Sequence, residues 1–385
     1  MNRAPILAFS HVPWNSAVQR PHHIMSRLAR FRDVLFIEEP IPHRGDAEVE
    51  IVRALPRLSV VQTRLPGESR GFGSTGAHVL VPVLRKALDE RGWSRFTAWL
   101  CTPMAVGTAR ALGPKAVVYD CMEELSAFRF APAELRERER ELFDCADVVF
   151  TGGPSLQRAK RDLHPSVHCF PSSVDMAHFA GANGIPEARE QVEIPRPRLG
   201  FFGVIDERID LEIIRVLAAE RPDWQIILVG PVAKIDELRL PRAANIHYMG
   251  QRSYQDLPSF LAGWDACLMP FAMNASTRHQ TPARCLEYMA ADRPIVSTPV
   301  PDVAESYGDI VHLGRGAVGF LEACHRALHE PDSARSIRRA LASRVLRETS
   351  WEETVARMDR VLGWLGAWPA SRSGAEAMSA SRYAS

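Results

Sequence analysis

The sequence lacks the features that mark membrane-spanning, disulfide-bonded and nucleic-acid-binding proteins. No apolar run approaches the roughly 18 consecutive residues that a membrane span needs, and the opening MNRAPILAFS is too short for a secretory signal. The 7 cysteines stand singly, without a C-x-x-C pair, which is typical of reduced thiols. The formal net charge is +1 and no dense Lys/Arg run occurs, so no nucleic-acid partner is expected. We predict a cytoplasmic protein whose contact with a membrane is at most peripheral, at the inner face.

Two common nucleotide-binding motifs are missing from the glycine-containing stretch LGFFGVIDER, residues 199–208. It contains neither G-x-G-x-x-G nor G-x-x-x-x-G-K-[ST], whose backbone amides cradle phosphates in dinucleotide oxidoreductases and P-loop nucleotidases. Both classes are therefore disfavoured. The adjacent His22 and His23 have no third ligand at a useful spacing, so no metal site is expected.

Short apolar runs alternate with helical patterns along most of the 385 residues, which predicts repeated β-α units and parallel sheets. Strands are expected in the first half at Ile6–Ser10, Val34–Glu38, Leu58–Gln62, Thr97–Cys101, Val117–Asp120, Val148–Thr151 and Val167–Pro171. Strands are expected in the second half at Leu199–Phe202, Ile226–Val229, Ile246–Tyr248, Ala266–Met269, Ile295–Thr298 and near Ile310–Leu313. Helices should fill most of the intervening stretches, including Arg20–Arg30 and Thr75–Arg91.

We predict an α/β protein with two doubly wound, Rossmann-like domains that face each other across a cleft. The expected boundaries are 1–175 for the first domain, 176–197 for a linker rich in Gly and Pro, 198–350 for the second domain, 351–368 for a carboxyl-terminal helix that packs back toward the first domain, and 369–385 for a disordered tail. Ligands of such folds bind at the carboxyl ends of the strands.

The stretch TPARCLEYMAADRPIVST, residues 281–298, predicts an anion site. Thr281 and Pro282 suit the N-cap and first position of a helix, whose free amides and positive dipole end attract phosphate. Arg284 lies in the same turn. Glu287 projects from the same face three residues later, where its carboxylate can accept from a ribose diol. The alternative is an ordinary Arg–Glu pair on a helix surface.

Glycine and charge also follow the strand that begins the second domain. Gly203 ends the strand and permits close backbone approach to a ligand. Arg208, five residues later, is within reach of the same strand end. Taken alone, this stretch favours a plain strand-turn-helix with a solvated arginine, because a single glycine at a strand end is weak evidence for a ligand site.

Polar and aromatic residues follow two strands of the first domain. His11 and Trp14 come after the first strand, where Trp14 can stack on a sugar face. Asp120 and Glu123 lie at the carboxyl end of the strand VVYD, where a carboxylate of raised pKa would suit proton transfer. The alternative is an acid cluster that the dipole of the next helix favours.

Together these segments resemble the glycosyltransferases of the GT-B fold, specifically family 4 and its neighbours. In the carboxyl half the resemblance is carried by NIHYMGQRSYQDLPSFLAGWDACLMPF and TPARCLEYMAADRPIVSTPVPDVAESY. In the amino half, WNSAVQRPHHIMSRLA and VVYDCMEELSAF are similar to a subgroup that includes transferases for teichuronic acid and other cell-surface polysaccharides. The resemblance extends to about Trp364.

The resemblance assigns roles in donor binding. It implies that Glu287 binds the ribose, that the turn from Thr281 to Arg284 meets the diphosphate, that Gly203 approaches the phosphates, and that the backbone around Gln251 and Arg252 contacts the base. The sequence departs from the family at two places. His279 stands where a sugar-binding Glu is common, and Val204 replaces an Arg, which leaves Arg208 and Arg284 to neutralise the diphosphate.

The resemblance implies a retaining, metal-independent hexosyltransferase that uses a nucleoside-diphosphate sugar and a hydroxyl acceptor in polysaccharide or glycolipid biosynthesis. No cofactor is expected. Arg208, Arg284 and Glu123 are the catalytic candidates. The acceptor, free or lipid-linked, would meet His11, Trp14 and Asp120. The alternatives are a non-catalytic nucleotide-sugar-binding subunit, a GT-B epimerase or an inverting transferase, and, from a different class, a Rossmann oxidoreductase.

Overall fold

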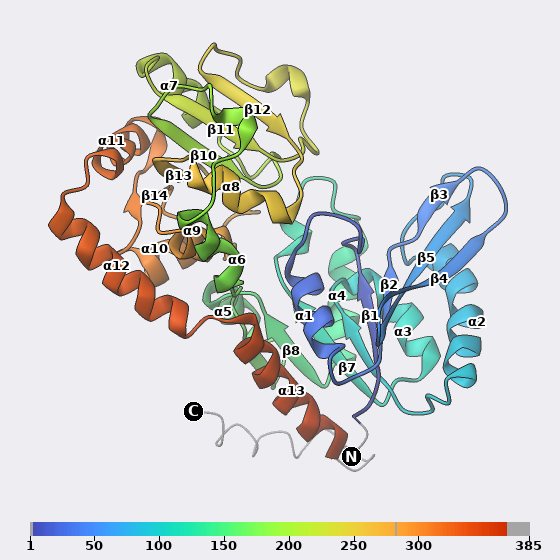
Figure 1. Cartoon of the computed structure of the whole chain (residues 1–385). Helices are drawn as coiled ribbons and strands as arrows, with labels where there is room; N and C mark the ends of the chain where they lie inside the picture. The colour runs from blue at the N-terminus through green and yellow to red at the C-terminus, as the bar shows by residue number, and fades with distance from the viewer. Residues whose placement is uncertain (1–2, 282, 368–385) are drawn as a thin grey trace. The chain divides into compact units, whose positions relative to one another are not determined.

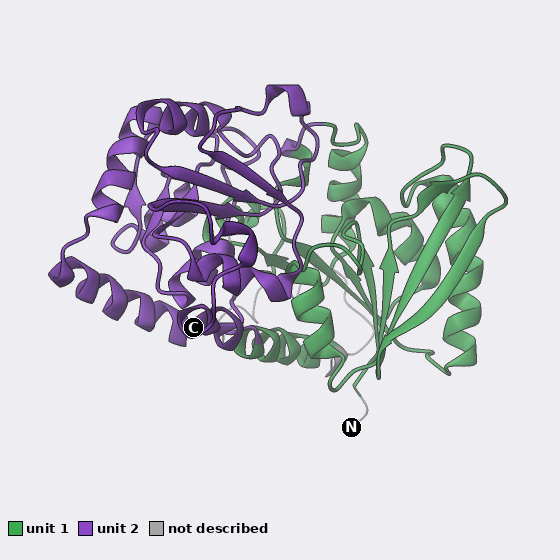
Figure 2. Cartoon of the chain, turned by 45° about the horizontal axis from the view of Figure 1, so that its top comes forward, with its two compact units in different colours: residues 1–126, 130–171, 352–385 green, residues 127–129, 172–351 purple. Residues whose placement is uncertain are grey.

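The computed structural model describes residues 3–281 and 283–367, which form two compact units (Figures 1 and 2). Of the described residues, unit 1 comprises 3–126, 130–171 and 352–367, and unit 2 comprises 127–129, 172–281 and 283–351. The tail expected at 369–385 lies outside the described residues. Each unit is built around one predominantly parallel sheet, so the predicted α/β class is confirmed.

Unit 1 contains a nine-stranded sheet in the order β3-β5-β2-β1-β6-β7-β8-β9, with β4 paired to β5. All pairings are parallel except β4 with β5. The strands are β1 Ile6–Ser10, β2 Val34–Glu38, β3 Ile41–His43, β4 Glu48–Leu55, β5 Leu58–Pro66, β6 Thr97–Leu100, β7 Ala116–Cys121, β8 Val148–Thr151 and β9 Val167–Cys169. The chain order reverses between β1 and β6, so the switch point of this sheet lies at the carboxyl end of β1.

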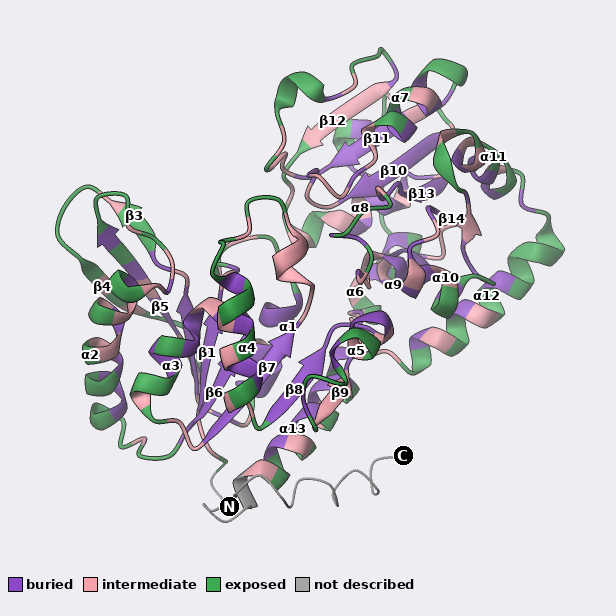
Figure 3. Ribbon diagram, turned by 180° about the vertical axis from the view of Figure 1, so that it is seen from behind, coloured by how far each residue is buried: buried purple, intermediate pink, exposed green. Residues whose placement is uncertain are grey.

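Strands β3 and β4, which pair with β5 in parallel and antiparallel orientation respectively, were not predicted. Strand β4 reads EVEIVRAL, in which three charged residues break up the apolar ones, and its residues are half-buried or exposed. Such a strand covers only one face and lacks the continuous apolar run of the central strands, which Figure 3 colours as buried.

The helices of unit 1 begin at or near the predicted residues. They are α1 Arg20–Leu28, α2 Ser74–Glu90, α3 Val106–Leu112, α4 Leu135–Cys145 and α5 Pro154–Lys160, joined by α13 Trp351–Ala367. In α2 the side chains of Leu80, Leu84 and Leu88 are buried in the core of the unit. From residue 352 onward α13 belongs to unit 1, where Arg32 donates to Asp359 at 2.7 Å.

One G-x-G-x-x-G sequence does occur in the chain, as Gly71-Phe72-Gly73-Ser74-Thr75-Gly76 at the start of α2. It departs from the dinucleotide fingerprint because β5 ends at Pro66, well before the glycines, and because the next strand, β6, runs into Cys101 rather than an acidic residue. The carbonyl of Gly71 lies where a Cβ of Gly76 would stand, so these glycines close a tight turn.

Unit 2 contains a six-stranded parallel sheet in the order β12-β11-β10-β13-β14-β15. The strands are β10 Arg198–Phe202, β11 Gln225–Val229, β12 Ile246–Gly250, β13 Ala266–Met269, β14 Ile295–Ser297 and β15 His312–Leu313. The chain order reverses between β10 and β13. Their carboxyl ends therefore form the switch point, where doubly wound sheets bind ligands.

The helices of unit 2 pack around this sheet, with α7 against α11 and α9 against α12. They are α6 Met176–Ala180, α7 Leu211–Glu220, α8 Leu257–Ala262, α9 Ala283–Ala290, α10 Pro301–Tyr307, α11 Gly316–Leu328 and α12 Asp332–Arg347. The stretch 176–197, expected to be a linker, contains α6 and two short 3₁₀ turns. Its Phe179 and Gln191 are fully buried, and the buried amide of Gln191 donates to the Phe260 carbonyl and accepts from the Trp264 indole.

None of the helices in the described part of the chain combines the length and the apolar content that crossing a bilayer requires.

Candidate functional site

Tyr288 fixes the orientation of helix α9 against the first strand of unit 2. The side chain is fully buried, its hydroxyl accepts a hydrogen bond from the Phe202 amide at 3.2 Å, and its ring meets Phe202 edge-on at 5.0 Å. Arg284 precedes Tyr288 by one helical turn, so it projects from the same face. The anchor at Tyr288 therefore brings Arg284 to the carboxyl end of β10.

The guanidinium of Arg284 lies between aromatic rings rather than against an acid. Its Cζ is 5.0 Å from the centre of the Phe201 ring and 5.7 Å from that of Phe271. Its Nε is buried and has no hydrogen-bond partner among the described residues. Burial lowers the pKa of Arg284, and the charge of Arg208 contributes in the same direction. A cation held this way is poised to receive an anion.

Glu287 is half-buried one turn after Arg284. Burial raises the pKa of Glu287 from an ordinary 4.5 to about 7, and the positive charge of Arg284 opposes part of this rise. In the described part of the chain no ion pair or hydrogen bond joins the two side chains. The ordinary helix-surface pair considered above is therefore not formed, and the Glu287 carboxylate can accept from a ligand.

Gly203 gives Arg284 its place at the strand end. Its φ of 138° is one that residues with a Cβ rarely adopt, and a Cβ there would overlap the Arg284 guanidinium. Gly230, which follows the neighbouring strand β11, has a φ of 146° and packs against the carbonyl of Gly203. The two glycines let the strand ends and the arginine occupy one small volume.

Arg208 reaches the same region with its charge already paired. Its Nε lies 2.9 Å and its Nη2 2.7 Å from the two carboxylate oxygens of Asp206, which is buried. The backbone carbonyl of Arg208 accepts from the Ala272 amide at 2.8 Å, which ties the loop after β10 to the loop after β13. We name Gly203, Arg208, Arg284 and Glu287 the strand-end cluster.

Sequence reasoning missed one cation near this cluster. Lys234 follows β11, is exposed, and has its Nζ 5.1 Å from the ring of Phe128, the same ring over which Arg208 lies. No motif marks this lysine. Only the parallel pairing of β11 beside β10 could have suggested that the loops after both strands meet.

Thr281 and His279 precede α9 on the loop from β13. The hydroxyl of Thr281 donates to the carboxylate of Asp302 at the start of α10, so its partner in the structure is this acid rather than an amide of α9. His279 is half-buried, and its place in the donor site stays a prediction. Gln280 between them is buried, and its Oε1 has no partner among the described residues.

Gln251 and Arg252 follow Gly250 at the end of β12. Gln251 is exposed, whereas Arg252 lies over the Phe260 ring and forms an ion pair with Glu190 at 3.1 Å. The Arg252 side chain is therefore held against the stretch 176–197. The expectation for these residues concerned their backbone, and it stays a prediction.

Asp120 in unit 1, expected to meet the acceptor, is instead a buried acid whose bonds are made within the protein. It is fully buried, and its Oδ1 receives Nε and Nη2 of Arg20 at 3.2 and 3.0 Å. Its Oδ2 accepts from the Trp99 indole at 3.2 Å. Both oxygens are therefore occupied inside the core. Leaving this buried carboxylate unpaired would cost free energy of folding.

His11, Trp14 and Glu123 are half-buried after the strands β1 and β7. The Trp14 ring packs on Phe36 at 5.1 Å and on His22 at 5.4 Å, so part of its surface is already covered by protein. The amide of Trp14 donates to Glu38 at 2.7 Å. These three residues lie at strand ends as predicted, within unit 1.

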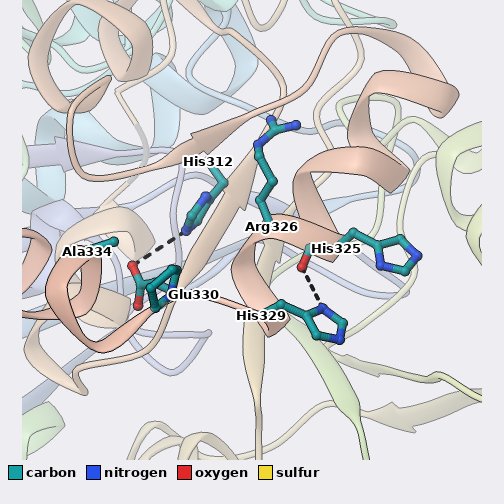
Figure 4. A pocket seen from close by; sticks show the side chains of 7 residues that line it. His312, His325, Arg326, His329, Glu330 and Ala334 are labelled. Atoms are coloured by element: carbon teal, nitrogen blue, oxygen red, sulfur yellow. Dashed lines mark hydrogen bonds and ion pairs between the residues drawn. The ribbon is translucent and has the colours of Figure 1, made fainter.

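A pocket of about 510 Å³ lies elsewhere in unit 2, between the end of α11 and the start of α12 (Figure 4). His312 points toward Glu330, whose carboxylate also receives Arg338 at 2.9 Å. His325 and His329 stack one turn apart. None of its lining residues belongs to the strand-end cluster, and the buried Glu330 is saturated by its own arginines.

Comparison with known proteins finds glycosyltransferases among the proteins that this chain resembles. Residues 208–360 match the family described as "Glycosyl transferase-like". The chain is 26% identical over 252 residues to the "Putative teichuronic acid biosynthesis glycosyltransferase TuaH" of Bacillus subtilis, a match that covers 59% of this chain and 62% of that protein. It is 24% identical over 316 residues to a GDP-mannose-dependent monoacylated alpha-(1-6)-phosphatidylinositol monomannoside mannosyltransferase of Corynebacterium glutamicum, covering 75% and 80%.

Solved structures agree on the fold. Sucrose-phosphate synthase from Thermosynechococcus elongatus is similar with a TM-score of 0.69 at 16% identity, over 95% of this chain and all of that one. An alpha,alpha-trehalose 6-phosphate synthase from Burkholderia multivorans gives 0.69 at 14% identity, over 95% and 99%. At these identities the likeness concerns the fold, and it confirms two Rossmann-like domains of the GT-B type.

Proposed function

We propose that this chain, which has the GT-B fold and carries a glycosyl transferase-like domain at residues 208–360, is a retaining glycosyltransferase. Its donor is a nucleoside-diphosphate sugar, and its acceptor is a hydroxyl group of a polysaccharide or glycolipid precursor. The two curated relatives support this choice, because one is named for teichuronic acid biosynthesis and the other uses GDP-mannose and a phosphatidylinositol mannoside.

One observation carries the proposal. The guanidinium of Arg284 lies over the rings of Phe201 and Phe271, with its Nε buried and no acidic partner in the described residues, at the switch point of the sheet in unit 2. The amides at the start of α9 lie in the same turn. A diphosphate fits this environment because it would supply the negatively charged partner that the Arg284 guanidinium does not have in the described residues.

The reaction requires that the leaving diphosphate be stabilised as the bond between the sugar C1 and the phosphate oxygen breaks. That bond's electron pair passes to the diphosphate, and the acceptor oxygen bonds to C1 on the face that the diphosphate leaves. The acceptor proton passes to a phosphate oxygen. Arg284, with Arg208 beside it, stabilises the growing negative charge, and we propose that these cations serve in place of a metal ion.

Glu287 would hold the ribose of the donor. Its half-buried carboxylate is one turn from Arg284, so a nucleotide that places its phosphates at Arg284 can direct its ribose hydroxyls to Glu287. Two hydroxyl donors would stabilise the ionised form that burial disfavours. Hydrogen bonds from the ribose would also explain why a half-buried acid occurs in a helix that is apolar apart from Glu287 and Arg284.

The test is a transfer assay with UDP-, GDP- and ADP-linked hexoses, each with and without a panel of glycolipid and oligosaccharide acceptors, in buffer containing EDTA. We expect nucleoside diphosphate release that depends on acceptor, and a product whose anomeric configuration, read by NMR, matches that of the donor. An inverted product would reject retention, and donor binding without turnover on any acceptor would favour a non-catalytic subunit. Loss of activity in EDTA would reject metal independence.

A further inference from the structure

Residues 127–129 form an isolated piece of unit 2. In the chain they follow β7 and stand between two segments of unit 1, yet their contacts assign them to unit 2, with which Figure 2 colours them. The amide of Arg129 donates to Oε1 of Glu207 at 3.2 Å. This bond ties the piece to the loop that follows β10, next to Arg208.

The ring of Phe128 gathers two cations from neighbouring strand ends. The Cζ of Arg208 is 5.5 Å and the Nζ of Lys234 is 5.1 Å from the centre of this ring. Arg208 comes from the loop after β10 and Lys234 from the loop after β11. Both distances fall within the range of about 6 Å in which the face of an aromatic ring attracts a cation.

The ring of Phe128 attracts both Arg208 and Lys234, and this attraction opposes the repulsion between their two positive charges. Asp206 neutralises Arg208, but the lysine is exposed, and neither a hydrogen bond nor a salt bridge of Lys234 is found among the described residues. Its contact with Phe128 is thus what holds a long, flexible side chain near the strand ends. Without the ring, Lys234 would gain rotamer freedom and turn toward solvent.

We propose that Phe128 is a positioning residue that holds Arg208 and Lys234 together, so that both cations act on the phosphates of the nucleotide-sugar donor. This inference rests on the proposed function. Lys234, after β11, then has the same role as Arg208, after β10: each brings a positive charge to the phosphates. Phe128 acts through these two cations and does not have to touch the substrate. An aromatic face is needed, because an aliphatic side chain of similar size has no negative surface to offer a cation.

The test compares Phe128→Ala, Phe128→Leu and Phe128→Tyr with Phe130→Ala, a control two residues further along the chain, at a residue that is 74% exposed. Titration calorimetry measures the binding of UDP, GDP and ADP and of the matching nucleosides without phosphate, for each full-length variant. Circular dichroism confirms that each variant is folded. The variants Lys234→Ala and Phe128→Ala/Lys234→Ala complete a double-mutant cycle.

We expect Phe128→Ala and Phe128→Leu to weaken binding of the preferred nucleoside diphosphate by about 3- to 30-fold, the range of one to two cation–π contacts. Nucleoside binding, Phe128→Tyr and Phe130→Ala should stay near wild type. In the cycle, removal of Lys234 should have a smaller effect once Phe128 is gone.

Two results overturn the inference while the proposed function stands. The first is wild-type diphosphate affinity in Phe128→Leu, which would reduce the ring to apolar packing. The second is equal weakening of diphosphate and nucleoside, which would place Phe128 against the base or the ribose. If the wild-type protein binds none of the three diphosphates, the proposed function fails first, and the inference fails with it.

Discussion

The guanidinium of Arg284 occupies the space that a Cβ at Gly203 would need. This contact joins the second residue of α9 to the end of β10, two segments 81 positions apart in the chain. It also makes the glycine and the arginine interdependent, because a larger residue at 203 displaces the cation. The relationship gives the site a test that does not remove any charged group.

Gly203→Ala should weaken nucleoside diphosphate binding by about tenfold or more, because the added methyl group displaces the Arg284 guanidinium. A loss of roughly 1.4 kcal/mol in binding free energy from this one charge-assisted contact already lowers the affinity tenfold. The substitution also strains a φ of 138°, so a lower melting temperature is expected. Calorimetric titration and thermal unfolding measure both effects. Gly107→Ala is the matched control, because an added Cβ there meets no atom within 4 Å.

Arg284→Ala should lower kcat more than it raises KM for the donor, because the charge of the diphosphate grows as the glycosidic bond breaks. Arg284→Lys should recover only part of the rate, since an ammonium cannot match the planar guanidinium between Phe201 and Phe271. Steady-state kinetics with a saturating acceptor separates the two constants. Arg215→Ala, which removes an exposed helix pair with Glu212, is the control. A pure KM effect would reduce Arg284 to a binding residue.

The strands of both sheets could be predicted because each is a short apolar run between turn signals. The runs VLFIE and ACLM are buried at every position and their predicted bounds match the observed ones, whereas β5 and β12 run four and two residues further than predicted. Strand β4 could not be predicted in this way, because EVEIVRAL is amphipathic and only its pairing with β5 makes it a strand.

The sequence predicted the candidate site only where the residues that lie close together belong to one segment of the chain. Arg284 and Glu287 lie on one helix face, so their spacing already implies proximity. The partner of Asp120 could not be predicted from the sequence, because Asp120 meets Arg20, which is 100 residues away in the chain. Lys234 was missed for the same reason: only the parallel register of β10 and β11 brings its loop beside that of Arg208.

Asp120→Ala should destabilise the protein by about 3–5 kcal/mol, because it leaves the buried guanidinium of Arg20 without its acid. Chemical denaturation monitored by circular dichroism measures the loss. Asp89→Ala, which removes an exposed acid from the end of α2, should change stability by less than about 0.5 kcal/mol. If Asp120→Ala kept its stability and lost only acceptor affinity, the carboxylate would have the acceptor role predicted from the sequence.

The raised pKa of Glu287 predicts how stability and donor binding depend on pH. The folded protein holds a proton on Glu287 up to about pH 7, whereas the unfolded chain releases it near 4.5, so the folded state binds more protons between these values. Stability from this group is therefore full below about pH 4.5 and falls as the pH rises through about 7. Glu287→Gln removes the titration, and its melting temperature should exceed that of wild type at pH 8 by more than at pH 5.

Donor binding should follow the opposite trend if Glu287 accepts from the ribose as a carboxylate. Affinity for the nucleoside diphosphate should then rise with pH through about 7 in wild type, and that rise should be absent in Glu287→Gln, which binds weakly at both ends of the range. The titration of the diphosphate itself, with a second pKa near 6, contributes equally to both proteins and cancels in the comparison. Parallel titrations from pH 5.5 to 8.5 measure the difference. Parallel pH profiles for the two proteins would show that the ribose binds elsewhere, and would leave the arginine at the strand end as the only support for the nucleotide site.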